Sequence, residues 1–448
     1  MKYYFVGIAG FGMSALAQIA RGQGHEVWGS DRNFDSGKAE KLREKFIEKG
    51  IRICPQDGSA LDKSFDAAIF STAVEESNPE FQKASGLGIK IIHRSDFLAQ
   101  YVNRFKTIAV SGTSGKSTVT ALIYHILERN GFSPWLITGG ALNELIEKGE
   151  IGNAACGKSE WLVIEADESD GTLVKYRPYA GVILNISKDH KDISQLMDIF
   201  KTFAANSGKL FVNADDSLLG DISGRKFFFG LKSDETRFSD IELRFDSSSF
   251  KLNSVPFELP LPGLHNVANL AAAARVCCEV ASISMRQVAE AVKDFKGVYR
   301  RFNLLGEKNG VLVIDDFAHN PAKIEAALSA ASLEIKGKII AIYQPHGFAP
   351  TRMLKNELIE SFARSLRSED LLIMPQIYYA GGTVSKDISS LDIVKALQSK
   401  GKRGIYFENR SDIPAQIKKL AMPKDRVIVM GARDLTLRDF ALDILNSL

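Results

Sequence analysis

Long apolar runs are missing from this 448-residue sequence. No stretch reaches 18 consecutive apolar residues, so no membrane-spanning helix is expected. The first residues lead directly into a strand and a glycine turn, and they lack the apolar core and cleavage site of a secretory signal. The four cysteines show neither zinc-binding nor redox spacing, which argues against a disulfide framework. These absences predict a cytoplasmic protein with reduced thiols.

An excess of charge of one sign is also missing. The 57 basic and 54 acidic residues leave a net charge of +3, too little to attract nucleic acid or an anionic membrane surface. Apolar residues make up 45% and charged residues 25% of the chain, as in ordinary globular proteins. A chain of this length folds into about two to four domains. We therefore expect several globular domains that bind small molecules, with no nucleic-acid or membrane partner.

The strongest motif lies between residues 107 and 128. An apolar run at 108–110 predicts a buried strand, and the apolar periodicity of 119–127 predicts a helix. The backbone N–H groups of a glycine-rich loop at such a junction, together with the helix N-terminus, bind phosphate. The candidate nucleotide-binding residues of this loop are Gly112, Thr113, Ser114, Gly115, Lys116, Ser117 and Thr118.

Two side chains of this loop are expected to contact the phosphates or their metal ion. Lys116 is expected to reach the β- and γ-phosphates, and the Ser117 hydroxyl to hold Mg2+. The full phosphate-loop pattern has a further glycine where Val110 stands, so the loop is shortened. The alternative is an ordinary glycine-rich turn with a solvated lysine. The Gly-Lys-Ser sequence at a strand-to-helix junction favours the phosphate site.

Two further strands are predicted to end beside this loop. The strand at 161–164 precedes an acidic run in which Glu165 and Glu168 are candidates for the site, and Glu165 is expected to hold metal directly or through water. The acidic run is alternatively a solvated loop. The strand at 180–184 leads to His190, which either binds a second Mg2+ or faces the transferring phosphate; the alternative is a surface histidine near a helix N-terminus.

The first 30 residues form a βαβ pattern, with its helix predicted at 15–21. Glycines at positions 7, 10 and 12 follow the first strand, and Asp31 follows the second. Ala15 stands where the dinucleotide-binding pattern has its third glycine. The turn could therefore bind NAD or a nucleotide diphosphate, or be a tight turn alone. Ligands of open α/β sheets bind at the strand ends, which here include 71–74 and 93–95.

Strands also alternate with helices in the last third of the chain. Strands are predicted at 311–314, 338–343, 370–374 and 426–430, with a helix at 321–331. The predicted fold class is α/β, with three domains that are each built on a mainly parallel sheet with flanking helices. The first and last would be Rossmann-like, and the central one a P-loop ATPase domain.

Four stretches together resemble the Mur ligase family, whose members use ATP to join an amino acid or peptide to a UDP-linked muramyl precursor. They are GTSGKS (112–117), EADESD (165–170), GLHNVANLAAA (263–273), and RRF (300–302) ahead of DDFAHNP (315–321). Their order and spacing span nearly the whole chain.

Further motifs resemble the alanine-adding members of the family, which act on UDP-N-acetylmuramate. They are GIAGFGMSALA (7–17), STAV (71–74), NPE (78–80), and QPH (344–346) with Thr351 and Arg352. Members that recycle a tripeptide are close relatives, and another small amino acid or a peptide remains open as the acceptor. The resemblance implies a UDP-sugar-binding domain (1–105), a central ATP-binding domain (106–296) and a C-terminal amino-acid-binding domain (297–448).

The resemblance also implies roles for individual residues, with ATP and Mg2+ as cofactors. Metal would be held by Ser117, Glu165 and His190. ATP would contact His265, Asn266, Asn269, Arg301 and Asp316 besides the phosphate loop. The UDP substrate would contact Gly10, Phe11, Gly12, Met13, Ser14, Asp31, Ser71, Thr72, Ala73, His93 and Arg94. The catalytic set would be Lys116, Glu165, His190, His346 and Arg352.

Four positions depart from the alanine-adding pattern. Ser114 and Asn320 replace histidines, Ser117 replaces threonine, and Gly347 replaces arginine. Arg352 is then the expected anchor for the amino-acid carboxylate. Two other classes remain as alternatives: an oxidoreductase that uses the N-terminal glycine turn, and an ATP-dependent regulatory protein without an acceptor site.

Overall fold

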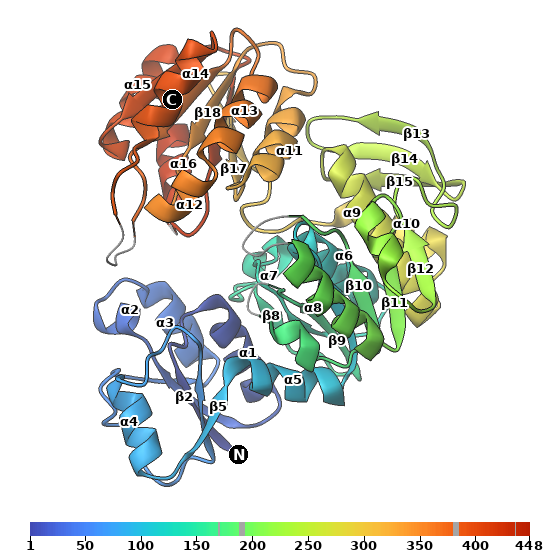
Figure 1. Cartoon of the computed structure of the whole chain (residues 1–448), viewed down its shortest axis with the longest axis vertical. Helices are drawn as coiled ribbons and strands as arrows, with labels where there is room; N and C mark the ends of the chain where they lie inside the picture. The colour runs from blue at the N-terminus through green and yellow to red at the C-terminus, as the bar shows by residue number, and fades with distance from the viewer. Residues whose placement is uncertain (169–170, 188–192, 380–384, 435) are drawn as a thin grey trace. The chain divides into compact units, whose positions relative to one another are not determined.

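The computed structural model describes residues 1–168, 171–187, 193–379, 385–434 and 436–448. The chain folds into two compact units (Figure 1). The first contains residues 1–241, 249–260 and 266–298, and the second contains residues 242–248, 261–265 and 299–448. Among the described residues, no helix is long and apolar enough to cross a membrane.

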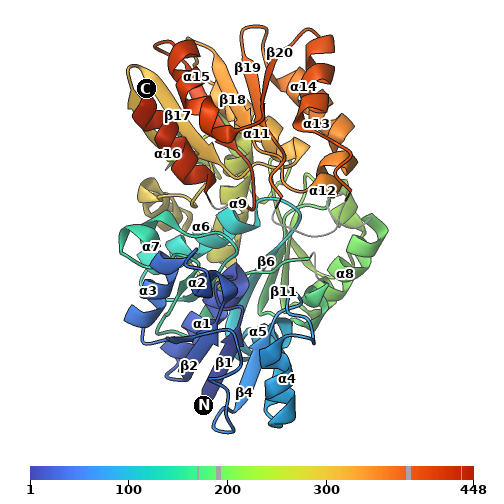
Figure 2. The same cartoon turned by 90° about the vertical axis from the view of Figure 1, so that its left-hand side faces the viewer.

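The first unit begins with a five-stranded sheet in the order β3-β2-β1-β4-β5. All of its recorded strand pairs are parallel, and β1, β2 and β4 can be followed side by side in Figure 2. The strands are β1 (Lys2–Val6), β2 (Glu26–Ser30), β3 (Arg52–Cys54), β4 (Ala67–Phe70) and β5 (Lys90–His93). The helices are α1 (Phe11–Gly22), α2 (Arg32–Asp35), α3 (Glu40–Glu48), α4 (Pro79–Gly86) and α5 (Arg94–Arg104).

A seven-stranded sheet follows, in the order β12-β11-β10-β6-β9-β7-β8, with only β8 antiparallel to its neighbour. Its strands are β6 (Lys106–Ser111), β7 (Trp135–Ile137), β8 (Ala154–Ala155), β9 (Trp161–Glu165), β10 (Ala180–Ile183), β11 (Lys209–Asn213) and β12 (Lys226–Phe229). Its helices are α6 (Lys116–Arg129), α7 (Asn143–Glu147) and α8 (Ile193–Asn206), with 3-10 turns at Thr172–Lys175 and Ser217–Asp221. The central strand β6 leads directly into the predicted phosphate loop.

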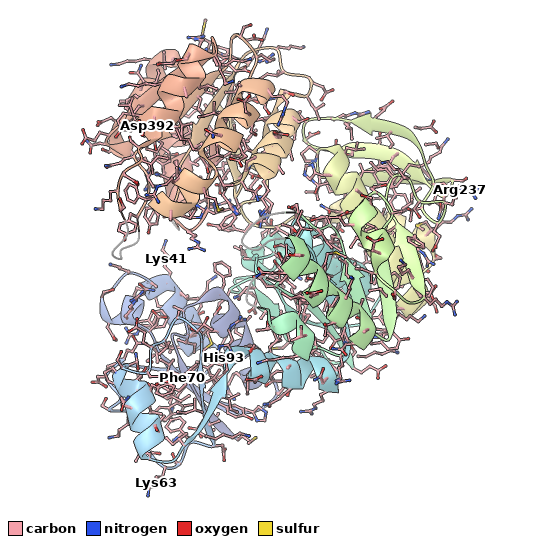
Figure 3. The ribbon with its side chains drawn as sticks, in the orientation of Figure 1. Lys41, Lys63, Phe70, His93, Arg237 and Asp392 are labelled. Atoms are coloured by element: carbon pink, nitrogen blue, oxygen red, sulfur yellow. The ribbon has the colours of Figure 1, made fainter. Side chains whose placement is uncertain are left out.

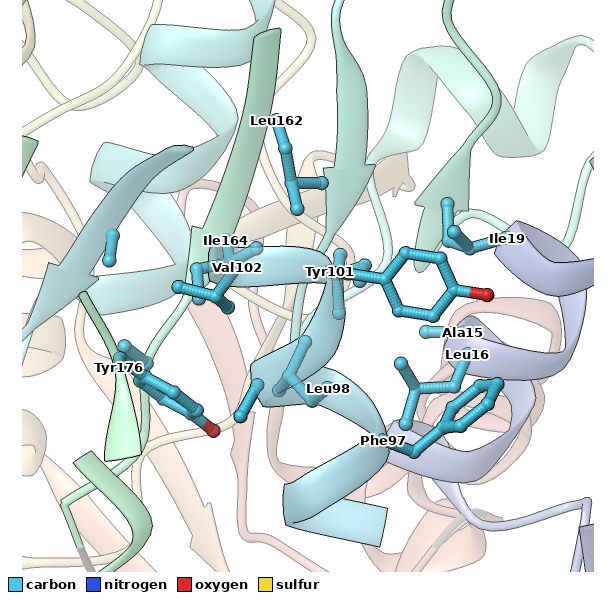
Figure 4. Packing of buried hydrophobic residues seen from close by; sticks show 14 of the residues in the cluster. Ala15, Leu16, Ile19, Phe97, Leu98, Tyr101, Val102, Leu162, Ile164 and Tyr176 are labelled. Atoms are coloured by element: carbon cyan, nitrogen blue, oxygen red, sulfur yellow. The ribbon is translucent and has the colours of Figure 1, made fainter. Parts of the chain in front are cut away.

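The five-stranded and seven-stranded sheets of the first unit share one hydrophobic core. Ile19 of α1 and Tyr101 of α5 lie side by side, with Phe97 next along α5 (Figure 4). The ring of Phe105, which precedes β6, lies 5.7 Å from the ring of Trp135 in β7. Burial of large aromatic side chains on both sides of residue 105 stabilises the two parts as one body.

The last part of the central segment adds a three-stranded sheet and two helices. The strands are β13 (Phe238–Leu243), β14 (Ser248–Leu252) and β15 (Val255–Leu259), and the helices are α9 (Leu264–Ala281) and α10 (Met285–Ala291), followed by a 3-10 turn at Val292–Asp294.

The second unit is built on a six-stranded sheet in the order β16-β17-β21-β18-β19-β20, in which only the edge strand β16 is antiparallel. Its strands are β16 (Asn303–Lys308), β17 (Val311–Asp316), β18 (Ile339–Tyr343), β19 (Leu371–Pro375), β20 (Arg403–Phe407) and β21 (Arg426–Met430). Its helices are α11 (Pro321–Ser332), α12 (Phe348–Met353), α13 (Lys355–Ser365), α14 (Ser390–Ser399), α15 (Ile413–Leu420) and α16 (Leu437–Ser447), with a 3-10 turn at Arg410–Asp412.

The predicted fold class is confirmed, since three mainly parallel sheets with flanking helices follow one another along the chain. Helix starts differ from the prediction. The apolar pattern placed the first helix from residue 15, but α1 begins at Phe11, directly after its cap Gly10. Gly12 in this first turn is a poor helix former, which explains why the apolar pattern alone did not include it.

Candidate active site

Two glycines give the phosphate loop its shape. Gly112 has φ +131° and Gly115 has φ +88°, conformations that residues with a side chain rarely adopt. Gly115 also packs closely, since a Cβ atom there would lie 2.6 Å from Oδ1 of Asn269 on α9. The predicted loop therefore lies against the predicted adenine-side motif within one unit.

Asn185 holds the loop from the neighbouring strand. Its Oδ1 accepts a hydrogen bond from the Ser114 N–H at 2.8 Å, and its Nδ2 donates to the Ser114 carbonyl at 2.9 Å. Thr113 and Ser187 form a second pair, in which the Ser187 N–H donates to Oγ1 of Thr113 at 2.9 Å. The parallel pairing of β6 with β10 brings these segments together. Asn185 was missed as a site residue, although its place after a strand beside β6 was a signal.

Lys116 lies inside the loop and not in solvent. Its Nζ donates to the Gly112 carbonyl and to Oε2 of Glu168, each at 2.8 Å, and lies 4.0 Å from Asp167. Burial lowers the pKa of this ammonium, but Glu168, Asp167 and Glu165 outweigh burial and leave the pKa raised. Lys116 is therefore charged, and its ammonium lies where it can bind an anion.

Glu165 and Ser117 lie on either side of a short glycine segment. Oε2 of Glu165 accepts hydrogen bonds from the Thr138 hydroxyl at 3.1 Å and from the Gly139 N–H at 2.8 Å. A Cβ atom at Gly140 would lie 3.3 Å from Oγ of Ser117. The structure thus brings both predicted metal ligands that it describes to the same edge of the sheet.

The structure describes some of the remaining predicted residues of this region and not others. Asn269 donates to Oδ1 of Asn266 at 3.3 Å on α9, so the two adenine-side asparagines are neighbours. His190 lies outside the described residues. Among the residues that the structure describes, no group of three His, Cys, Asp or Glu side chains converges as a ready-made metal site.

The predicted UDP-binding turn is hydrogen-bonded to the end of β2. The N–H groups of Gly7 and Ile8 donate to the Ser30 carbonyl at 2.9 and 3.0 Å. The Ala9 N–H donates to Oδ2 of Asp31 at 3.0 Å. Asp31 therefore shapes the turn and caps α2 by accepting from the Asn33 N–H.

Other residues predicted for the UDP substrate lie around this turn. The side chain of Arg94 crosses Gly12, where a Cβ atom would lie 3.0 Å from its Nη1. His93 caps α5 by accepting a hydrogen bond from the Ser95 N–H. It is paired with Phe70 in the parallel strands β4 and β5, and Figure 3 shows the two residues close together. Residues 71–73 form the turn after β4.

Three residues at the start of α1 differ in the groups that a substrate could contact. The side chain of Met13 is buried in the core, which leaves only its backbone for the substrate. The Ser14 hydroxyl donates to the Phe11 carbonyl at 2.9 Å and accepts from Nδ2 of Asn153 at 2.6 Å. The Phe11 side chain is 47% exposed and is available to a ligand.

In the second unit, two adjacent arginines have different roles. Arg300 is buried, and its Nε donates to Oδ1 of Asp315 at 3.0 Å while Nη2 donates to the Gly431 carbonyl at 2.9 Å. Arg301 lies over the ring of Phe317, with its Cζ 5.0 Å from the ring centroid. Arg300 therefore fixes the fold, and Arg301 is the better-placed arginine for a ligand.

Asp316 is held by hydrogen bonds from the backbone. Its two oxygens accept from the N–H groups of Phe302 and Ala318, each at 2.6 Å. Burial raises the pKa of Asp316 to about 6, against the lowering effect of Arg301 and these hydrogen bonds. His265, the third ATP-side residue of this unit, is the second residue of α9 and is exposed.

The predicted acceptor residues also belong to the second unit. The ring of His346 lies 5.6 Å from that of His319. Arg352 donates to the Ser385 carbonyl at 3.2 Å and forms an ion pair with Asp387 at the surface. An incoming carboxylate at Arg352 would have to replace Asp387.

Two of the departures from the family pattern have local structural roles. Asn320 caps α11, with its Oδ1 accepting from the Lys323 N–H at 3.0 Å. Gly347 precedes α12 with φ +73°, a conformation that favours glycine.

These features define a P-loop nucleotide-binding enzyme made of successive α/β sheets. The chain belongs to the Mur ligase family. Residues 2–106 match the description "Mur ligase family, catalytic domain", residues 110–277 "Mur ligase middle domain", and residues 300–433 "Mur ligase, glutamate ligase domain".

Similar proteins cover nearly the whole chain. A UDP-N-acetylmuramate–L-alanine ligase of Rhizobium etli is 34% identical in an alignment that covers 97% of this chain and 94% of that protein. One of Carboxydothermus hydrogenoformans is 35% identical, and the alignment covers 96% of this chain and 94% of that protein. The crystal structure of the UDP-N-acetylmuramate-alanine ligase of Thermotoga maritima is 25% identical, with a TM-score of 0.82 over 100% of this chain and 98% of that one. A murein peptide ligase of Psychrobacter arcticus shares the fold, with a TM-score of 0.69 and 21% identity over 100% and 98% of the two chains.

Proposed function

We propose that this protein joins L-alanine to UDP-N-acetylmuramate in an ATP-dependent step of peptidoglycan precursor synthesis. The observation that carries the proposal is the charged Lys116 in the phosphate loop, on the same sheet edge as Glu165 and Ser117. The similarity to alanine ligases over 97% of the chain supports the choice of substrates. Since the reaction consumes ATP, we place it in the cytoplasm.

The chemistry requires activation of a carboxylate, because oxide is not a leaving group. A carboxylate oxygen of the muramyl group attacks the γ-phosphorus of ATP, the bond to ADP breaks, and an acyl phosphate forms. The amine of alanine then attacks the acyl carbon, phosphate leaves, and the amine loses a proton. Negative charge develops on the transferring phosphoryl oxygens in the first step, where Lys116 and the loop N–H groups stabilise it.

Glu168 has a supporting role in this scheme. It balances the charge of Lys116 in a place where Lys116 is 13% and Glu168 is 7% exposed. A γ-phosphate carries the same charge sign as this carboxylate and therefore replaces it as the partner of the ammonium. Lys116 thus moves a short way from one anion to another and stays charged throughout.

The side chains of Glu165 and Ser117 are suitable ligands for a magnesium ion. Mg2+ in nucleotide-using enzymes takes one or two protein oxygen ligands besides phosphate and water. The carboxylate of Glu165 and the hydroxyl of Ser117 are such ligands, with Thr138 and Gly139 orienting the carboxylate. A bound Mg2+ would neutralise charge on the phosphates. We propose His190 as a further ligand of the metal or of the phosphate.

The UDP group is assigned to the glycine turn at residues 7–14 with Asp31, the 71–73 turn, His93 and Arg94. The exposed ring of Phe11 and the N–H groups at the start of α1 support this assignment. On the acceptor side, His346 and Arg352 stay our candidates, and Arg352 would bind the carboxylate of alanine.

A single assay tests the proposal. The protein is incubated with ATP, Mg2+, UDP-N-acetylmuramate and one amine at a time: L-alanine, glycine, L-serine or the recycled tripeptide. Phosphate release is expected only with an amine, and fastest with L-alanine. If phosphate release is fastest with the tripeptide, the tripeptide is the acceptor and L-alanine is not. A nicotinamide absorbance change would support an oxidoreductase, and ATP binding without turnover would support a regulatory protein.

A further inference from the structure

A cavity of about 560 Å³ lies in the first unit, away from the proposed substrate sites. It is lined by the C-terminal part of α1, the residue after α3, the end of α7, and β8. The glycine turn lies at the other end of α1, and a helix of 12 residues spans about 18 Å. A volume of this size is typical of sites for small molecules.

The polar wall of the cavity is mainly basic. Arg21, Lys49 and Lys148 line it, and Glu150 is its single acidic residue. Lys49 pairs with Glu150, and Lys45 donates to the Glu150 carbonyl at 2.8 Å. The charges of Arg21 and Lys148 therefore remain for an anion, since no ion pair is recorded for either in the described part of the chain.

A buried amide on α1 also faces this cavity. Gln18 lines it and is only 4% exposed. Its Nε2 donates to the Ser14 carbonyl at 3.1 Å and to Oδ1 of Asn153 at 2.9 Å. The Ser14 carbonyl can only accept, so the amide orientation is fixed, and Oε1 is the group left for a donor in the cavity.

The same amide connects the cavity to the glycine turn. Asn153, the partner of Gln18, donates to the Phe11 carbonyl at 2.8 Å and to the Ser14 hydroxyl at 2.6 Å. Phe11 and Ser14 are residues assigned to the UDP substrate. A shift of Gln18 would therefore be transmitted to the first turn of α1 through two buried hydrogen-bonding side chains.

We propose that this cavity is a binding site for a small organic polyanion, bearing carboxylates or phosphate, that is distinct from the substrates. Arg21 and Lys148 would pair with its charges, a protonated oxygen would donate to Oε1 of Gln18, and Leu145, Ala154 and Ala155 would contact its carbon skeleton. Its binding is coupled to the UDP substrate through Gln18 and Asn153. The coupling rests on the proposed function, but the binding does not.

Cys156 provides a direct measurement, because it is an exposed residue in the cavity wall. The full-length protein is labelled with N-ethylmaleimide, and the modification of each cysteine is followed by mass spectrometry. Tricarballylate or glycerol 3-phosphate should slow labelling of Cys156 about threefold at a concentration of about twice its Kd. Labelling of Cys54 and Cys278 should not change. Sodium chloride of equal ionic strength serves as the salt control.

Two double variants complete the test. Arg21→Gln/Lys148→Gln should abolish the protection, whereas Lys41→Gln/Lys63→Gln, at exposed lysines labelled in Figure 3, should keep it. Equal protection in both variants, or none by either anion in the native protein, would overturn the proposal.

The coupling is measured separately. Tricarballylate should change the Kd for UDP-N-acetylmuramate, measured by calorimetry, by about twofold or more, and the UDP substrate should change the apparent Kd of tricarballylate by the same factor. Protection of Cys156 with an unchanged Kd for UDP-N-acetylmuramate would refute the coupling and keep the binding site. Loss of ligase activity in every condition would count against the proposed function alone.

Discussion

At the scale of single residues, Lys116 has the best-defined environment in the site. Its ammonium is mostly buried and charged beside Glu168. Lys116→Ala should lower kcat by at least about 10²- to 10³-fold, because it removes a fixed positive charge from the phosphoryl-transfer step. Binding of UDP-N-acetylmuramate, measured by calorimetry, should be unchanged.

The matched control for this change is Lys41→Ala, which removes an exposed lysine of α3. It should leave phosphate release unchanged. Turnover that persists in Lys116→Ala would remove the phosphate-loop assignment.

His319 is predicted to make the protein less stable in acid. Burial lowers its pKa to about 3, helped by Lys323. Below pH 6.5 the unfolded chain binds a proton that the folded ring does not, so the free energy of unfolding falls as the pH drops. The loss should be about 1.4 kcal/mol per pH unit between pH 6 and 4.

Urea denaturation of the native protein and of His319→Gln at pH 7, 5 and 4 measures this effect. The buried Asp316, whose pKa of about 6 works in the opposite direction, is present in both proteins and cancels in the comparison. The native protein should lose stability relative to the variant as the pH falls, and parallel curves would contradict the prediction.

The placement of site residues could be predicted from sequence where the signal is local. The places of Lys116 and Ser117 follow from six consecutive residues, and that of Glu165 from the end of a single strand. The contacts of Asn185 and Gln18 could not be predicted in the same way. Their partners Ser114 and Asn153 are 71 and 135 residues away along the chain, and only the folded sheets bring them together.

At the scale of elements, the start of α6 depends on Gly115. Gly115→Ala would strain a residue with φ +88° and place a Cβ atom 2.6 Å from Oδ1 of Asn269. The strain costs about 1–2 kcal/mol, and the displaced Asn269 should weaken ATP binding. We expect a lower melting temperature and a higher Kd for ATP.

The turn that follows the same helix provides the control for this substitution. Gly131, just beyond the end of α6, has φ +81°, and a Cβ atom there would meet no atom within 4 Å. Gly131→Ala should therefore cost similar stability without changing the Kd for ATP. Equal losses of ATP affinity in the two variants would show that the contact with Asn269 is unimportant.

Most strands could be predicted, because buried parallel strands are short apolar runs. The helix starts were harder. Besides α1, helix α9 begins at Leu264, six residues before its continuous run of apolar residues starts at Leu270. The polar residues in its first turns carry the proposed ligand contacts, so the periodicity is interrupted where function is concentrated.

At the scale of the whole molecule, the domain boundaries involve contacts that sequence patterns do not show. The division at residues 105 and 296 stays a prediction. The structure joins the first two sheets through a shared core and assigns 242–248 and 261–265 to the second unit. These short segments are distant in sequence from residues 299–448, and no local signal identifies their partners.

The two units also divide the proposed reaction between different residues. Lys116 and Glu165 of the first unit are assigned to acyl phosphate formation, and Arg352 of the second to binding of alanine. Hydroxylamine is a small amine without a carboxylate, so it can trap the acyl phosphate as a hydroxamate without using Arg352.

Arg352→Ala should therefore raise the KM for L-alanine at least about tenfold. The reason is that a charge-assisted pair contributes about 1.4 kcal/mol or more, which corresponds to a factor of ten. It should form hydroxamate at the native rate. Lys116→Ala should lose both activities, and Arg364→Ala, at an exposed arginine of α13, should lose neither. Hydroxamate formation that falls in parallel with alanine ligation in Arg352→Ala would move Arg352 from the amine-binding step to the phosphoryl-transfer step, because only the first step is common to both reactions.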